Sequence, residues 1–272
     1  MAYLRRLGPG RLHGYNGAME QTLKATVRYD GTDFAGWQVQ PGQRTVQGVI
    51  EDALATMAGQ PVRIAGAGRT DSGVHALGQV FSCRWSGAKS VEELRRSLSQ
   101  LLNPEIRVEE VSVVPDDFHA QHSALGKRYA YAVCHAREQD PFLAQYGWTV
   151  PWEVNLAYVA DLAQRVVGEH DFAGFCSSGS SVETTVRTIQ SAEVREGPIV
   201  GPTDAAGAWR LELHGNGFLY KMVRNIVGTI ADIARGQTPE ARLNELLNAP
   251  APFHGYTAPA KGLFLVEVEY PH

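Results

Sequence analysis

In the N-terminal part of the chain, the spacing of apolar residues changes several times between the two-residue repeat of a strand and the repeat of a helix. Apolar and polar residues alternate from Gln21 to Asp30, which predicts a half-buried strand. A helical stripe begins at Val46, and a second follows the capping-box residues Ser90 and Glu93. The expected elements are a strand over 21–30, a helix over 46–59, a short strand over 62–65, a strand over 79–85, a helix over 90–102 and a strand over 106–113. This order, β-α-β-β-α-β, is that of the split βαβ arrangement.

The C-terminal part has a matching order of elements, although the two sequences do not visibly repeat. Strands are expected over 127–134, 185–194, 208–214 and 264–270, and helices over 155–168, 218–234 and 238–247. We therefore predict an α+β protein with two split-βαβ, ferredoxin-like halves, residues 21–125 and 126–272. Their mainly antiparallel sheets either join or face one another, with an active-site cleft between the halves. Residues 1–20 are expected to form a flexible extension, with Met1 and Met19 as candidate starts.

Composition and charge narrow the possible functions. The 272 residues are 44% hydrophobic and 20% charged, and no apolar run reaches the roughly 20 residues needed to cross a bilayer. Cys83, Cys134 and Cys176 match no zinc spacing, and so few cysteines favour a reducing, cytoplasmic location. The net charge of −4 is not that of a general nucleic-acid binder. Any RNA binding would therefore need a local basic surface.

The densest group of reactive side chains lies between Gly68 and Ala76, in the sequence G-R-T-D-S-G-V-H-A. A polar loop that leaves a strand is where a scaffold displays functional groups, although the same residue types also form ordinary turns. Asp71 could serve as a metal ligand, a general base or a nucleophile. Only His75 stands close to it in sequence, so a single carboxylate is favoured over a metal site. We expect His75 to order the loop through hydrogen bonds.

Three other segments carry candidate side chains. The strand K-R-Y-A-Y places Tyr129 and Tyr131 on one face, which suits either a core or a binding surface. Arg224 lies off the apolar stripe of its helix, as a solvated basic face or a functional group would. Leu263 and Leu265 share one face of the last strand, where they could pack in the core or form the wall of a pocket.

Five blocks of the chain resemble, in order, the motifs of the TruA family of tRNA pseudouridine synthases. The resemblance extends from about residue 22 to residue 270, and several blocks in register are more specific than one. Phe264 stands where the family usually has tyrosine. The blocks are Y-D-G-T-D-F-A-G-W-Q at 29–38, G-R-T-D-S-G-V-H at 68–75, F-H-A-Q-H-S-A at 118–124 leading into K-R-Y-A-Y at 127–131, M-V-R-N-I-V-G at 222–228 and G-L-F-L at 262–265.

The resemblance implies roles for side chains in four of these blocks. Asp71 would be the catalytic aspartate, Arg224 would pair with it and orient it, and Tyr129 would stack on the target base. Leu265 would form an apolar wall of the base pocket, with Leu263 as the alternative. Whether Asp71 attacks C1′ or C6 of the nucleotide, or acts as a base, stays open. The basic side chains expected to contact RNA are Arg69, Lys127, Arg128, Arg187 and Lys221.

The resemblance further implies an isomerase that converts uridine to pseudouridine at positions 38 to 40, in the anticodon stem-loop of tRNA. It implies a homodimer that binds tRNA and requires no cofactor and no metal. The sequence has no phosphate-binding loop or dinucleotide motif, in agreement with an isomerisation. Two alternatives stay open: an inactive protein that binds structured RNA, and a metal-dependent hydrolase that uses Asp71 and His75.

Overall fold

The computed structural model describes residues 20–135, 137, 141, 144–179, 182–201, 207–248 and 253–271. Most of the extension expected over residues 1–20 lies outside these ranges. The elements up to residue 125 are β1 (Gln21–Tyr29), α1 (Val46–Ala58), β2 (Ile64–Gly66), β3 (His75–Trp85), α2 (Val91–Leu102) and β4 (Ile106–Val114). The later elements are β5 (Gly126–His135), β6 (Trp148–Val150), α3 (Leu156–Gln164), β7 (Gly168–Asp171), β8 (Val186–Glu196), β9 (Ala208–Gly215), α4 (Met222–Ala234), α5 (Ala241–Asn248) and β10 (Leu263–Glu269), with 3₁₀ turns at Phe172–Phe175 and Ala260–Gly262.

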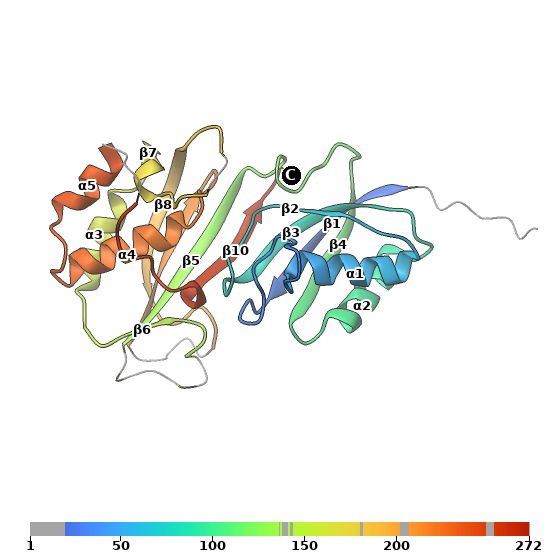
Figure 1. The fold of residues 1–272 in the computed structure, drawn as a ribbon, viewed down its shortest axis with the longest axis horizontal. Coiled ribbons are helices and arrows are strands. Elements are labelled where there is room, and N and C mark those ends of the chain that lie inside the picture. The colour runs from blue at the N-terminus through green and yellow to red at the C-terminus, as the bar shows by residue number, and fades with distance from the viewer. Residues whose placement is uncertain are drawn as a thin grey trace, which may run out of the picture.

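All strands belong to one mixed sheet that is mostly antiparallel. Its order is β4-β1-β3-β10-β5-β9-β8-β7, with β2 paired to β3 and β6 paired to β5. The last strand, β10, runs parallel to β3 and antiparallel to β5, so it joins the two halves of the chain (Figure 1). The α+β class is therefore confirmed, and the two sheets join rather than face one another. The split βαβ details and the cleft stay predictions.

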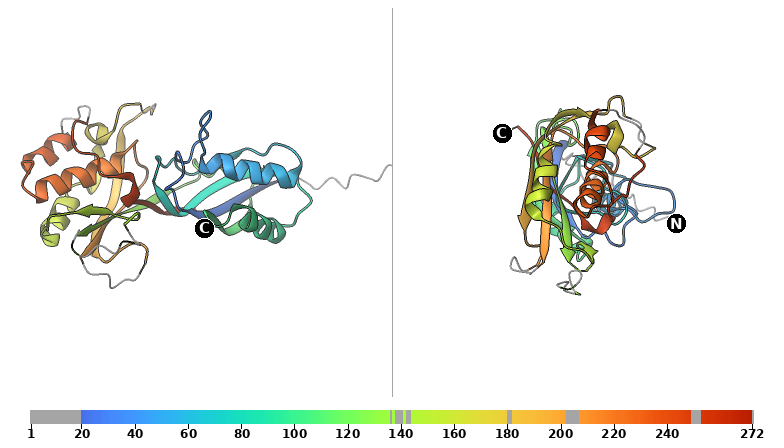
Figure 2. Two further views of the ribbon diagram at one scale, coloured as in Figure 1. Left: turned by 60° about the horizontal axis from the view of Figure 1, so that its bottom comes forward. Right: turned by 90° about the vertical axis from the view of Figure 1, so that its left-hand side faces the viewer.

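The helices are divided between the two halves. Helices α1 and α2 lie beside the strands formed by residues 21–114, and α3, α4 and α5 lie beside the later strands (Figure 2). The Thr45 side chain caps α1 by accepting the N–H of Gly48, and Ser90 and Glu93 form the expected capping box of α2. No helix in the described ranges is long and apolar enough to cross a membrane.

Three boundaries differ from the sequence prediction, one because a distant strand pairs there and two because of the local backbone conformation. Strand β3 begins at His75, not residue 79, because β10 pairs with its first two residues. Helix α3 ends at Gln164, and the chain then enters β7 through Gly168, whose φ of 116° favours glycine. Helix α4 begins at Met222 rather than residue 218, since Lys221 has a left-handed φ of 59°.

Candidate active site

The loop that contains Asp71 connects β2 to β3 and is anchored on both sides. The Thr70 hydroxyl bonds to the Tyr29 hydroxyl at 2.8 Å, and the Thr70 carbonyl accepts the N–H of Trp37 at 3.0 Å. Also before Asp71, the Gln79 amide donates to the Gly68 carbonyl at 2.8 Å, and directly after Asp71 the Ser72 hydroxyl donates to the Phe34 carbonyl at 3.2 Å. These bonds fix the residues on either side of Asp71, so its carboxylate has a defined position.

Asp71 and Arg224, which are 153 residues apart in sequence, form an ion pair between the two halves. Arg224 Nη1 donates to Asp71 Oδ2 at 2.8 Å, and the side chains are 13% and 21% exposed. Among the described residues, no donor reaches Asp71 Oδ1. One carboxylate oxygen is therefore held in place while the other stays open, which suits a group that must react.

Arg224 is itself held by the segment that precedes β10. Its Nε donates to the Ala258 carbonyl at 2.7 Å, and the N–H of Ala258 donates to the Arg224 carbonyl at 3.2 Å. This segment approaches α4 closely, because a Cβ on Gly228 would lie 1.9 Å from the Tyr256 carbonyl oxygen. The Tyr131 hydroxyl fixes the next residue through a 2.8 Å bond to the Pro259 carbonyl. The guanidinium is thus oriented at two of its nitrogen atoms.

Tyr129 lies in the middle of the sheet beside the leucine of the last strand. It pairs with Leu265 of β10 on one side and with Leu213 of β9 on the other. Its ring is 6% exposed and makes an edge contact with Phe218, with 5.0 Å between ring centroids. Burial, together with the charges of Tyr29 and Asp71, raises the pKa of the Tyr129 hydroxyl well above its usual range. The structure thus places Tyr129, Leu265 and Asp71 together.

Comparison with known proteins gives separate evidence about the family of this chain. A family model described as tRNA pseudouridine synthase matches residues 25–123 and 162–271. The chain belongs to the tRNA pseudouridine synthase family. It is 42% identical over 249 residues to tRNA pseudouridine synthase A of Lacticaseibacillus casei (strain BL23), covering 91% of this chain and 98% of the relative. It is 41% identical over 255 residues to tRNA pseudouridine synthase A of Geobacillus kaustophilus (strain HTA426), covering 93% and 95%.

The enzyme is therefore an RNA pseudouridine synthase, an isomerase. Among solved structures, a chain titled as part of a Cbf5-Nop10-Gar1 complex covers 89% of this chain and 57% of its own length. Its TM-score is 0.35 and its sequence identity is 12%. That likeness is too weak to carry any argument, and the family assignment rests on the sequence relatives and the family model.

The basic residues expected at the substrate occupy different positions around the site. Lys127 lies near the catalytic loop, since its Nζ is 3.5 Å from where a Cβ on Gly68 would be. Arg69 is exposed and forms no bond with a described residue, and Lys221 lies 5.0 Å from the Tyr220 ring centroid. Arg128 instead lies on the opposite face from Tyr129, near two carboxylates. Those are the carboxylates of Glu267 and Glu269, at 3.7 and 3.8 Å.

His75 is the first residue of β3, directly after the loop that contains Asp71, and it bonds to the backbone of the loop that follows β1. Its Nδ1 lies 3.1 Å from the backbone nitrogen of Gly31 and 3.1 Å from Asp30 Oδ1. The ring is 1% exposed and stacks on Phe264, with 4.7 Å between ring centroids. Burial lowers the pKa of His75 by more than the nearby charge of Asp30 raises it.

This buried histidine makes the stability of the fold depend on pH. In the unfolded chain this histidine has a pKa of 6.5 and binds a proton as the pH falls through that value. In the folded protein the pKa of His75 is lower, so the ring binds the proton only at a lower pH. The free energy of unfolding should therefore decrease between pH 7 and pH 5, by up to about 1.4 kcal/mol per pH unit. Urea unfolding at several pH values measures the slope. His75→Gln should flatten it, and exposed His254→Gln should not; equal slopes in both variants would contradict the prediction.

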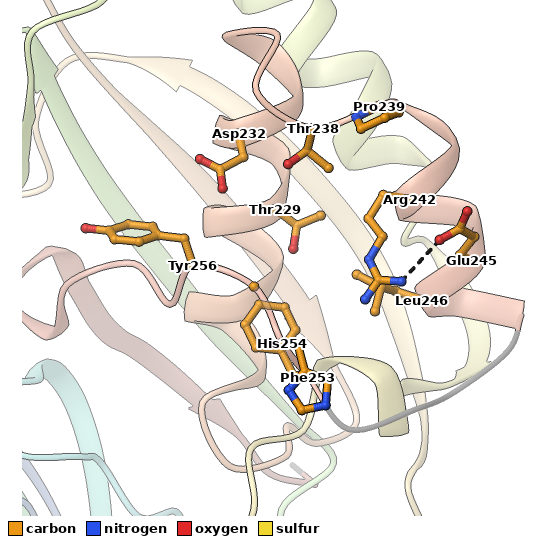
Figure 3. Close-up of a pocket in the computed structure, with 11 residues that line it drawn as sticks. Thr229, Asp232, Thr238, Pro239, Arg242, Glu245, Leu246, Phe253, His254 and Tyr256 are labelled. Carbon is orange, nitrogen blue, oxygen red and sulfur yellow. Dashed lines mark hydrogen bonds and ion pairs between the residues drawn. The ribbon is translucent and has the colours of Figure 1, made fainter.

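A separate pocket of about 200 Å³ lies between α4, α5 and the segment over 253–256 (Figure 3). Its lining contains none of Asp71, Tyr129 or Arg224. No group of three or more histidine, cysteine, aspartate or glutamate residues within the described ranges could hold a metal ion.

Sequence reasoning missed several groups that complete the site. The Ala258 carbonyl, the Phe218 ring and the Tyr29–Thr70 bond were not among the expected features. A backbone carbonyl has no sequence signature, so Ala258 was not predictable. Gly228 offered one signal, because a glycine inside a helix usually marks a close approach of another segment.

Proposed function

We propose that this enzyme converts uridine to pseudouridine at positions 38 to 40, in the anticodon stem-loop of tRNA. The observation that carries the chemistry is the Asp71–Arg224 pair, in which one carboxylate oxygen is held and the other is open. The relatives named above are tRNA pseudouridine synthases, which supports tRNA as the substrate. The position within tRNA follows from the resemblance of the motifs.

In the proposed mechanism, Asp71 acts in one of two ways. It is either the nucleophile, which attacks C1′ of the ribose or C6 of the uracil, or a base. The N1–C1′ bond breaks, the uracil turns, and a new bond joins C5 to C1′. Any bond that Asp71 has formed with the substrate is broken again, which restores the free carboxylate, and the C5 proton is lost while N1 gains one. Arg224 orients the carboxylate throughout, because its bonds to Asp71 and Ala258 fix the plane of the guanidinium. Atoms and electrons balance without an oxidant or a reductant.

The base-binding roles fall to the residues around Asp71. Tyr129 would stack on the uracil and Leu265 would form an apolar wall beside it, as their pairing across β5 and β10 allows. Because the Tyr129 ring is nearly covered, with Phe218 against it, the uracil would enter only when Phe218 moves. Exposed Arg69, next to the catalytic loop, would help to hold the base out of the stack.

The same proposal includes a homodimer in the cytoplasm that contacts one tRNA with both subunits. Its catalytic and target claims are tested by mapping pseudouridine in tRNA from a strain that lacks this gene. We expect pseudouridine to disappear from positions 38 to 40 and to return with the wild-type gene, but not with the Asp71→Asn gene. Unchanged modification at these positions, or loss at other positions only, would contradict the proposed target.

A further inference from the structure

Lys127 and Arg187 differ from most cationic side chains in the described part of the chain, because neither has a carboxylate partner there. Within the described ranges, arginines such as Arg165 and Arg210 form ion pairs. No such pair is formed by Lys127 or Arg187, and both side chains are half-buried. Burying a charge without a counter-ion is costly, so an unpaired half-buried cation needs an explanation.

The sheet brings these two cations to the same face, on either side of a glycine. Gly215 of β9 pairs with Lys127 of β5 and with Ile189 of β8. Arg187 precedes Ile189 by two residues on β8 and so lies on the same face as Ile189. Because Gly215 has no side chain, nothing from β9 projects between Lys127 and β8.

A second glycine lets the guanidinium lie against the backbone. Arg187 Nε is 3.4 Å from where a Cβ on Gly217 would be, and its Nη1 donates to the carbonyls of Thr184 and Val186 at 2.9 and 2.6 Å. Nε and Nη2 donate to no described residue. These bonds hold the group in place and leave donors for a ligand.

The charge of Arg187 acts on Lys127, and Lys127 adjoins the loop that contains Asp71. Burial lowers the pKa of Lys127, and the charge of Arg187 lowers it further. Lys127 Nζ and the Tyr129 hydroxyl both lie close to Gly68. They are 3.5 and 3.7 Å from the point where a Cβ on Gly68 would be. Any anion bound by this pair would therefore be next to the base that stacks on Tyr129.

We propose that Lys127 and Arg187 together bind the phosphodiester that flanks the target uridine. The inference rests on the proposed function, since it takes RNA as the substrate and Tyr129 as the base platform. An anion between the two side chains would offset their repulsion and would satisfy the free donors of both. Lys127 and Tyr129 are two residues apart on a strand, so their backbone positions are about 7 Å apart. This distance is comparable to that between a base and its own phosphate.

The test pairs a charge change in the protein with a charge change in the RNA. Full-length tRNA is assembled with a single methylphosphonate, which is uncharged, either 5′ or 3′ to the target uridine. With wild-type enzyme, one of these substitutions should lower kcat/KM by about 10- to 100-fold. Lys127→Gln and Arg187→Gln should be slow on unmodified tRNA. With either variant, the same methylphosphonate should have almost no further effect on kcat/KM. Arg195→Gln, a paired arginine on β8, is the matched control.

A second measurement separates binding from folding. Without RNA, Lys127→Gln should unfold at the same or a higher temperature than wild type, because it removes the repulsion from Arg187. With unmodified tRNA, the slope of log K against log salt should decrease by about 1. If, at both linkages, the methylphosphonate lowers kcat/KM of the variant by the same factor as that of wild type, the two changes act independently and the inference is wrong. If wild-type enzyme makes no pseudouridine in unmodified tRNA, the proposed function itself fails, so the two failures are distinguishable.

Discussion

Replacing Asp71 with asparagine is expected to abolish pseudouridine formation while leaving the fold and tRNA binding intact. The amide oxygen of asparagine can still accept the Arg224 hydrogen bond, so the local geometry should survive. The amide is not a nucleophile, however, and the open oxygen of Asp71 is the group that reacts in the proposed mechanism. We expect kcat to fall by roughly 10⁴-fold or more, the range found when a catalytic group that acts as part of a unit is removed.

Tritium release from tRNA labelled at C5 of uridine measures this loss directly, since C5 loses its hydrogen when it bonds to C1′. Filter binding should give a tRNA affinity within a few-fold of wild type, which shows that the variant fails at the chemical step. Asp232→Asn, on the far end of α4, is a control that should stay active, because its carboxylate pairs with Arg235 and not with Arg224. Substantial tritium release by Asp71→Asn would contradict the catalytic assignment.

Arg224→Lys is expected to lower kcat by about 100-fold with little change in KM. Lysine keeps the positive charge but has one nitrogen, so it cannot donate to Asp71 and to the Ala258 carbonyl in the arrangement that Arg224 uses. A carboxylate displaced by about 1 Å from its reactive position costs a factor of this size. Losing the donor to Ala258 should also lower the free energy of unfolding by about 1–3 kcal/mol.

Steady-state kinetics on tRNA, at a temperature where circular dichroism shows both proteins folded, separates kcat from KM. Arg235→Lys provides a matched change on the same helix, because Arg235 pairs with Asp232 near the end of α4. That control should keep wild-type kcat. If Arg224→Lys is as active as the control, the positioning role is wrong, and a rise in KM alone would mean that Arg224 binds RNA instead.

The sequence predicted some elements of secondary structure more closely than others. The strand from Gln21 and the helix from Val46 were predicted nearly to the residue, because apolar spacing and capping residues act within a few positions. The start of α4 was misplaced by four residues, since the left-handed backbone at Lys221 interrupts a helical pattern. Strands β6 and β7 were not predicted, because each is short and depends on a partner far away in sequence.

The sequence by itself determined the α+β class, the family motifs and Asp71 as the candidate nucleophile. These features depend on local periodicity and on residue types in short segments. The family resemblance predicted that Arg224 pairs with Asp71, and the structure shows this pair across 153 residues, with the Ala258 carbonyl holding the guanidinium. Only the tertiary structure decided that β10 joins the two halves and that Lys127 rather than Arg128 adjoins the loop that contains Asp71. The physical reason is that these contacts arise when distant apolar surfaces are buried against one another, and no local pattern encodes which distant segment will pair.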